Sequence, residues 1–111
     1  MIGQEWELVY YETESGNVPF REWFESLKDS KTQDILDARL LRLRSGNFGK
    51  YESLGLGLFE LKIYYGPGYR IYFGIAGAKV ILLLTGGNKS TQDKDIQTAH
   101  RYWKHFKEER E

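Results

Sequence analysis

The chain has 111 residues, with 16 lysines and arginines against 16 aspartates and glutamates, no cysteine and two histidines. This length allows one modest core, so we expect a single domain over residues 1–111. The lack of cysteine excludes disulfides, thiolate metal sites and cysteine nucleophiles, and a 41% apolar content argues against disorder. No apolar run approaches the length of a membrane span, so we expect a cytoplasmic protein without membrane contacts.

The net charge of zero hides a division between the two parts of the chain. Residues 1–37 carry nine acids and three bases, whereas residues 39–104 carry eleven bases and four acids. Such asymmetry is typical of a surface that binds an anionic partner. Attraction between the two halves, or simple solvation of both, explains the charges equally well.

The first half of the sequence predicts a strand followed by two helices. Residues 6–11 alternate like a strand, and Asn17 and Pro19 suit the start of a helix. This helix has an aromatic face formed by Phe20, Trp23, Phe24 and Leu27. The sequence from Ser30 to Gln33 matches a capping box that opens a second helix, which ends near Gly46 and buries Leu36, Leu40 and Leu43. So short a connection predicts an antiparallel helical hairpin.

The second half predicts three strands after an irregular, glycine-rich segment at residues 46–57. The strands are expected at residues 58–64, 69–75 and 79–85, with Ala76-Gly77 joining the last two. The apolar third strand belongs inside the sheet. A three-residue loop, Gly66-Pro67-Gly68, sets Lys62 opposite Tyr72. In that register, one face of the sheet carries Glu60, Lys62, Tyr64, Arg70 and Tyr72.

A terminal helix is expected after Gly86-Gly87, which should end the last strand. Ser90 can cap this helix with Asp93 as its reciprocal partner. Its apolar stripe contains Ile96, Ala99, Trp103 and Phe106. The predicted order is β-α-α-β-β-β-α, which makes an α+β protein with a helical hairpin and a C-terminal helix on a small, mostly antiparallel sheet.

The basic and aromatic face of the sheet suggests a platform for single-stranded RNA. Cations such as Lys62 and Arg70 hold phosphates, and exposed tyrosine rings stack on unpaired bases. The tyrosines concerned are Tyr64, Tyr69 and Tyr72. Composition alone favours the simpler interpretation that these rings pack within a half-buried sheet.

The sequence contains no nucleotide-binding loop, so we expect no cofactor. The two histidines, His100 and His105, are expected at the surface, so we expect no metal site. RNA cleavage would then use the adjacent 2′-OH as the nucleophile. Arg70 suits stabilisation of the charged phosphorane, and a strand arginine on a polar face should add little to the core. Lys62 could stabilise charge, or act as a base if nearby Arg70 lowered its pKa. Glu60 could be the base, but neutralising Lys62 is the favoured role.

Five segments together resemble one protein family. They are Phe20-Arg21-Glu22-Trp23-Phe24, Gly46-Asn47-Phe48-Gly49, Phe59-Glu60-Leu61-Lys62, Tyr65 to Tyr72, and Leu84 to Ser90. In this order they resemble the RelE/ParE superfamily of toxins from type II toxin–antitoxin modules, most closely the phage-derived Gp49-like, or HigB-like, addiction module killer proteins. The resemblance implies a RelE-like α+β fold and an mRNA interferase, an endoribonuclease that cleaves mRNA on the ribosome and inhibits translation.

The resemblance also implies roles and partners. Arg70 matches the family's phosphate-binding arginine, Lys62 matches a basic catalytic position, and Lys89 falls near another, with Arg42 as an RNA-binding addition from the second helix. The implied partners are mRNA on the ribosome and an antitoxin of the helix-turn-helix, HigA-like type. The toxin would contact operator DNA only through this antitoxin. Glu60 stands where RelE-type nucleases often carry a second lysine. ParE-like action on DNA gyrase, or an inactive toxin that only binds its antitoxin, remain alternatives.

Overall fold

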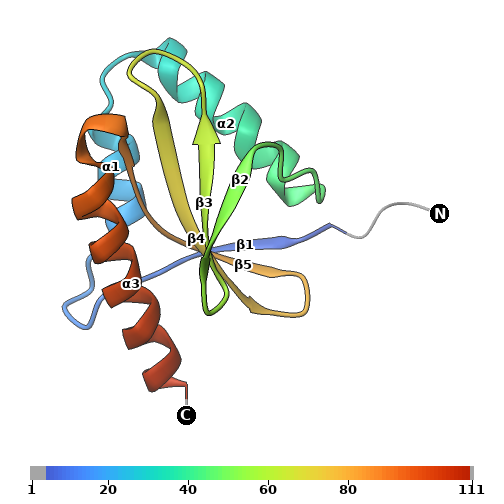
Figure 1. Ribbon diagram of the computed structural model, residues 1–111, viewed down its shortest axis with the longest axis vertical. Coiled ribbons are helices and arrows are strands. Elements are labelled where there is room, and N and C mark those ends of the chain that lie inside the picture. The colour runs from blue at the N-terminus through green and yellow to red at the C-terminus, as the bar shows by residue number, and fades with distance from the viewer. Residues whose placement is uncertain (1–4, 111) are drawn as a thin grey trace.

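The computed structural model describes residues 5–110 and contains a five-stranded mixed sheet with helices on both faces (Figure 1). Its strands are β1 (Glu7–Tyr10), β2 (Tyr51–Gly55), β3 (Leu58–Ile63), β4 (Tyr69–Gly77) and β5 (Val80–Asn88). The helices are α1 (Pro19–Ser26), α2 (Ser30–Arg44) and α3 (Gln92–Glu109), with a short 3-10 turn, η1 (Lys89–Thr91), before α3. The α+β class and the position of the apolar last strand inside the sheet, rather than at an edge, are confirmed.

The strand order is β1-β5-β4-β3-β2, with β1 parallel to β5 and the other neighbours antiparallel. Because successive side chains of a strand point to opposite faces, the sheet builds two cores. The α1 and α2 side contains Phe20, Leu36, Leu43, Leu61, Ile63, Ile71, Phe73, Ile81 and Leu83. The α3 side contains Tyr11, Leu58, Tyr72, Leu82, Leu84, Ala99 and Trp103. The predicted stripes on α2 and α3 therefore do face the sheet.

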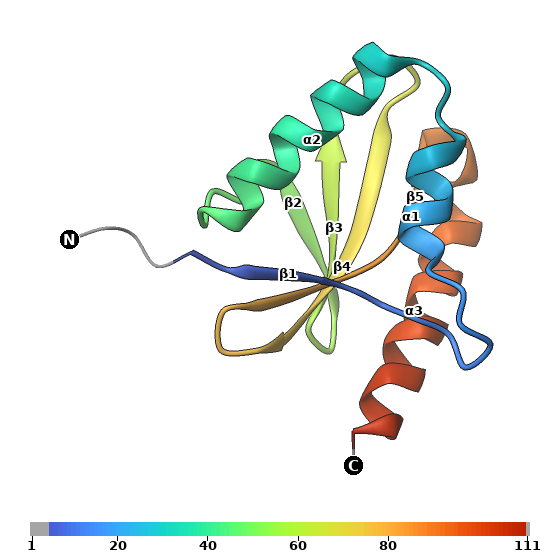
Figure 2. The ribbon, with the colours of Figure 1, turned by 180° about the vertical axis from the view of Figure 1, so that it is seen from behind.

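The starts of the first two helices differ from the sequence prediction. Val18, not Asn17, is the N-cap of α1, and its side chain makes no capping bond. The cap of α2 is Asp29, which accepts hydrogen bonds from the Lys31 amide and the Thr32 hydroxyl, in place of a capping box that begins at Ser30. The two helices share one face of the sheet but diverge from their connection, so the expected antiparallel hairpin is not formed (Figure 2).

The segment predicted to be irregular contains an additional strand, β2. It pairs with β3 through a two-residue turn, Leu56-Gly57, in which both residues have positive φ values of 58° and 85°. Two consecutive positive φ values are what a tight hairpin requires to match the twist of its strands. The observed order is therefore β-α-α-β-β-β-β-α, with one strand more than expected.

The register between β3 and β4 differs from the prediction by two residues. Lys62 lies opposite Arg70, not Tyr72, and Leu61 lies opposite Ile71, because the connecting loop is longer than three residues. A shift of two residues leaves every side chain on its original face, since side-chain direction repeats every two residues. The shared face of Glu60, Lys62, Arg70 and Tyr72 is thus retained.

The last hairpin and the start of α3 also depart from expectation. The turn between β4 and β5 is Ala78-Lys79, and β5 continues through Gly86 and Gly87 to Asn88. A side chain at Gly86 would overlap the Trp23 ring, and one at Gly87 would overlap Asp95, so these glycines allow helices to approach the strand. Asn88, not Ser90, caps the following turn.

Within residues 5–110, no helix combines the length and the apolar character that crossing a lipid bilayer demands.

Candidate functional site

Arg70 lies next to two other predicted basic residues, Lys62 and Lys89. Lys62 and Arg70 are direct cross-strand partners on β3 and β4. Lys89 follows β5 and lies near Arg70 at Gly68, where an added Cβ would be 3.0 Å from Nη1 of Arg70 and 3.6 Å from Cβ of Lys89. The prediction that Lys62 and Arg70 share one face of the sheet is confirmed.

Arg70 is not a surface residue. Its side chain is only 7% exposed, and its Nε lies 3.8 Å from Oε2 of Glu60, whose side chain is 1% exposed. Nη1 of Arg70 donates a hydrogen bond to the carbonyl of Gly68 at 3.0 Å, while Nε is buried without a hydrogen bond. The expectation that Arg70 adds little to the core is therefore wrong, because a buried charge needs its partner to remain stable.

The Glu60 carboxylate is the centre of a buried polar cluster. Its Oε2 accepts hydrogen bonds from the Tyr72 hydroxyl at 2.9 Å and from Nε2 of Gln92 at 2.8 Å. This carboxylate neutralises Arg70, so the predicted pairing of Glu60 with Lys62 is wrong. With its side chain 1% exposed, this carboxylate is also out of reach of a substrate hydroxyl and so is unsuited to the role of general base.

Tyr72 is fully buried, so it cannot stack on an RNA base as predicted. Burial, followed by the hydrogen bond to Glu60, raises the pKa of the Tyr72 phenol well above its usual range. The phenol consequently stays protonated and serves as a hydrogen-bond donor to Glu60. Its role is to support the site from the α3 side of the sheet.

Lys62 is partly exposed and pairs with a residue that the sequence analysis did not consider. Its Nζ lies 2.8 Å from Oε1 of Glu52 on β2. The hydrogen bond to Glu52 raises the pKa of Lys62, and Lys62 in turn lowers the pKa of Glu52. Lys62 is therefore held as a cation, and the suggestion that Arg70 lowers its pKa to make it a base is wrong.

The remaining RNA-binding candidates lie in different surroundings. Tyr64 is 70% exposed just beyond β3 and is available for stacking. Tyr69 is half-buried, with its ring centroid 6.4 Å from that of Trp23. Arg42 is exposed on α2, which covers the opposite face of the sheet from Glu60 and Tyr72, so the structure does not bring Arg42 to the site.

Lys89 borders an open surface pocket of about 440 Å³ that is lined by residues 89–94. This pocket contains a second cation, Lys94, and the first residues of α3, whose backbone amides carry partial positive charge. Gln92 connects the pocket to the buried Glu60 cluster. Neither Gln92 nor Glu52 was identified from sequence, although the turn-forming pattern Gly55-Leu56-Gly57 could have indicated β2 and hence Glu52.

Comparisons with known proteins identify one informative relative. The chain is 45% identical over 80 residues to an uncharacterized protein of Haemophilus influenzae, an alignment that covers 72% of this chain and 81% of that protein. The chain belongs to the same family as this Haemophilus protein. No family model matches the chain. Membership in this family carries no activity with it, because the Haemophilus protein has none assigned.

Proposed function

We propose that this chain is a RelE/ParE-type toxin of a type II toxin–antitoxin module with a RelE-like fold, and that it is a cytoplasmic mRNA endonuclease that acts on the ribosome. The observation that carries the proposal is the position of Arg70, which lies opposite Lys62 on the neighbouring strand and near Lys89 at Gly68. Of these cations, Lys62 is partly exposed and Lys89 borders an open pocket, so both suit contacts with the phosphates of a single strand. Tyr64, exposed two residues after Lys62, supplies a ring for stacking.

In this proposal the 2′-oxygen of the substrate attacks the adjacent phosphorus, and the bond from phosphorus to the 5′-oxygen breaks. The products are a 2′,3′-cyclic phosphate and a 5′-hydroxyl. Arg70 and Lys89 stabilise the additional negative charge on the phosphorane. Lys62, held protonated by Glu52, stabilises charge or gives a proton to the leaving oxygen.

The proton acceptor for the 2′-OH lies outside this group of cations. Glu52 is the exposed carboxylate that contacts Lys62, but Lys62 lowers its pKa and so weakens it as a base. In this proposal a group on the ribosome accepts the proton and so completes an active centre that has no strong base of its own. The proposed regulatory partner is a helix-turn-helix, HigA-like antitoxin, which would also carry the complex to operator DNA.

One observation favours a second candidate function. Arg70 and Tyr72 are buried, so two of the residues expected to contact RNA are withdrawn from the surface. A ParE-like toxin that acts on a protein such as DNA gyrase needs no accessible phosphate-binding arginine. A toxin that has lost its activity and retains only antitoxin binding would show the same burial.

Binding of a single-stranded RNA oligonucleotide, measured at several salt concentrations, tests the proposal. The variant Lys62→Ala/Lys89→Ala should bind more weakly, and its salt dependence should be shallower by about 0.7 for each lost phosphate contact. The charge-matched control is Lys28→Ala/Lys104→Ala, in which both lysines are exposed. Equal affinity and equal salt dependence in the two variants would contradict the assignment of the site.

A further inference from the structure

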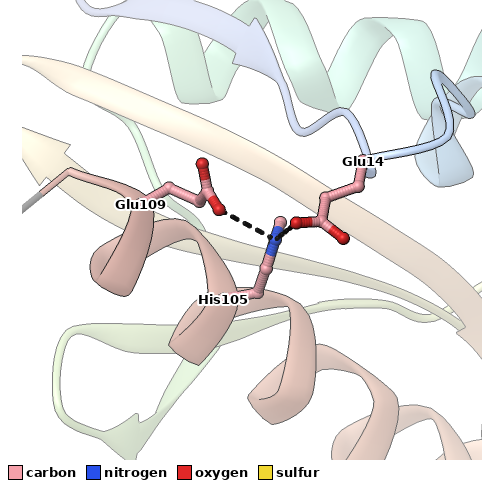
Figure 3. A group of neighbouring side chains, drawn as sticks. All are labelled: Glu14, His105 and Glu109. Atoms are coloured by element: carbon pink, nitrogen blue, oxygen red, sulfur yellow. Dashed lines mark ion pairs between the residues drawn. The ribbon is translucent and has the colours of Figure 1, made fainter.

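A second cluster of chemically active side chains lies at the far end of α3 (Figure 3). His105 and Glu109 are one helical turn apart on α3, and Glu14 reaches them from the segment between β1 and α1. Nε2 of His105 lies 3.6 Å from a carboxylate oxygen of Glu109 and 3.9 Å from one of Glu14. The three ligand atoms lie within 4.8 Å of one another.

His105 is held in a fixed orientation by Tyr11. The Tyr11 hydroxyl lies 2.6 Å from Nδ1 of His105, and the two rings meet edge to face with their centroids 5.9 Å apart. Tyr11 is 4% exposed and belongs to the core on the α3 side of the sheet, so it is a rigid support. Support of one imidazole nitrogen by a polar neighbour is the usual way in which proteins orient a histidine that binds a metal through the other nitrogen.

The other nitrogen, Nε2, is buried and has no hydrogen-bond partner among residues 5–110. It points toward the carboxylates of Glu14 and Glu109 (Figure 3), but both lie beyond hydrogen-bond distance. A buried nitrogen without a partner, facing two carboxylates, is an arrangement that a bound cation would complete. An open pocket of about 250 Å³, lined by residues of α3 and of the segment after β1, adjoins the cluster and admits solvent.

We propose that Glu14, His105 and Glu109 form a binding site for one divalent transition-metal ion of the zinc type, with a further position open to water. Zinc binds imidazole nitrogen and carboxylate oxygen at about 2.0–2.2 Å in tetrahedral geometry, which places neighbouring ligands about 3.4 Å apart. The observed separations of 3.6 and 3.9 Å need only small rotations of two exposed glutamates. Imidazole as a ligand favours zinc, nickel or copper over magnesium or calcium.

The site is independent of the proposed RNA cleavage. Gln92, in the buried cluster, and His105 are 13 residues apart on α3, which corresponds to about 20 Å along the helix. A metal here would connect the segment after β1 to the C-terminal part of α3, so its effect would be on the attachment of that helix. This differs from the sequence expectation, in which His105 was a surface residue and no metal was foreseen.

Calorimetric titration of the full, untagged chain with Zn²⁺ tests the proposal. The expected result is saturable binding of one ion per chain, with binding lost in His105→Ala and weakened at least tenfold in Glu109→Gln. Tyr11→Phe keeps all three ligands but removes the hydrogen bond that orients His105, so it should weaken binding about 10- to 100-fold. His100→Ala and Glu108→Gln are matched controls from the same helix and should bind as the unaltered chain does.

A second readout separates loss of the ligands from loss of the fold. Circular dichroism should show each variant folded, and Zn²⁺ should raise the melting temperature of the unaltered chain but not that of His105→Ala. Mg²⁺ should have no such effect. Absence of 1:1 binding, or binding that is equal in His105→Ala and His100→Ala, would overturn the proposal.

Discussion

Arg70 and Glu60 form an ion pair in the interior of the protein, where β3, β4 and the beginning of α3 meet. Tyr72 and Gln92 donate hydrogen bonds to the same carboxylate oxygen. Because each charge is removed from water, each depends on the other for its stability. The arginine proposed to bind phosphate is therefore also a structural residue, and its two roles must be separated by experiment.

Replacement of Arg70 by alanine should destabilise the fold by about 3 kcal/mol, because it leaves the Glu60 carboxylate buried without a counter-charge. Urea denaturation followed by circular dichroism measures this loss. Arg70→Met/Glu60→Gln removes both charges and should recover much of the stability. Lys62→Ala, at a partly exposed ion pair, should cost less than about 1 kcal/mol. An Arg70→Ala variant as stable as the unaltered chain would contradict the structural role.

Tyr72 should make the protein sensitive to alkaline pH. The pKa of Tyr72 is raised in the folded state, whereas a tyrosine in the unfolded chain has its ordinary pKa of about 10. The contribution of Tyr72 to stability is therefore complete below about pH 10 and is lost as the pH rises further. Tyr72→Phe should be less stable than the unaltered chain at pH 7, and the gap should narrow above pH 10. The difference between the two proteins is measured as the urea concentration at the midpoint of unfolding, at pH 7, 10 and 11. Tyr64→Phe, at an exposed position, is the control, and a gap for Tyr72→Phe that stays constant with pH would be evidence against the effect.

Gly74 allows Trp103 of α3 to lie against β4, because a Cβ at this position would overlap the indole ring. Gly74→Ala should therefore cost about 1–3 kcal/mol through overpacking. Gly77→Ala on the same strand is the matched control, since a Cβ there meets only Val80 at an ordinary distance of 3.9 Å. Equal stability of the two variants would mean that α3 is less closely packed than the structure indicates.

Leu61 lies in the core beneath α1 and α2 and is fully buried. Leu61→Ala should lower the free energy of unfolding by about 2–5 kcal/mol. Leu56→Ala removes the same atoms from a side chain that is 79% exposed, so its effect should be much smaller. Chemical denaturation of both variants provides the comparison, and a nearly neutral Leu61→Ala would show that the assignment of sheet faces is inverted.

The faces of the sheet could be predicted because they depend on a local repeat. Leu61 and Ile63 alternate with Glu60 and Lys62, and this alternation survives the two-residue error in register. The exact partners could not be predicted, because they depend on how the chain turns between Tyr64 and Gly68. β2 was missed because Tyr51–Gly55 is a mostly exposed edge strand with no apolar alternation.

The common face of Lys62 and Arg70 could be predicted, but the ion pairs on that face could not. Lys62 and Arg70 lie side by side because of strand pairing, and their common face follows from the alternation along β3 and β4. The choice of Glu60 as the partner of Arg70 depends on Gln92 and on the docking of α3, a non-local contact. The cluster at His105 was missed for the same reason, since Glu14 lies 91 positions earlier in the chain.

The central claim is that Lys62 and Lys89 serve RNA cleavage, and mapping of 5′ ends in cellular mRNA after induced expression tests it most directly. The strains would express the unaltered chain, Lys62→Ala/Lys89→Ala and the control Lys28→Ala/Lys104→Ala, each confirmed as folded. We predict growth arrest with new cuts inside translated regions for the unaltered chain and the control, and neither effect for Lys62→Ala/Lys89→Ala. Growth arrest with intact mRNA would contradict the claim and indicate a protein target, and cuts that persist in Lys62→Ala/Lys89→Ala would exclude these two lysines from the reaction.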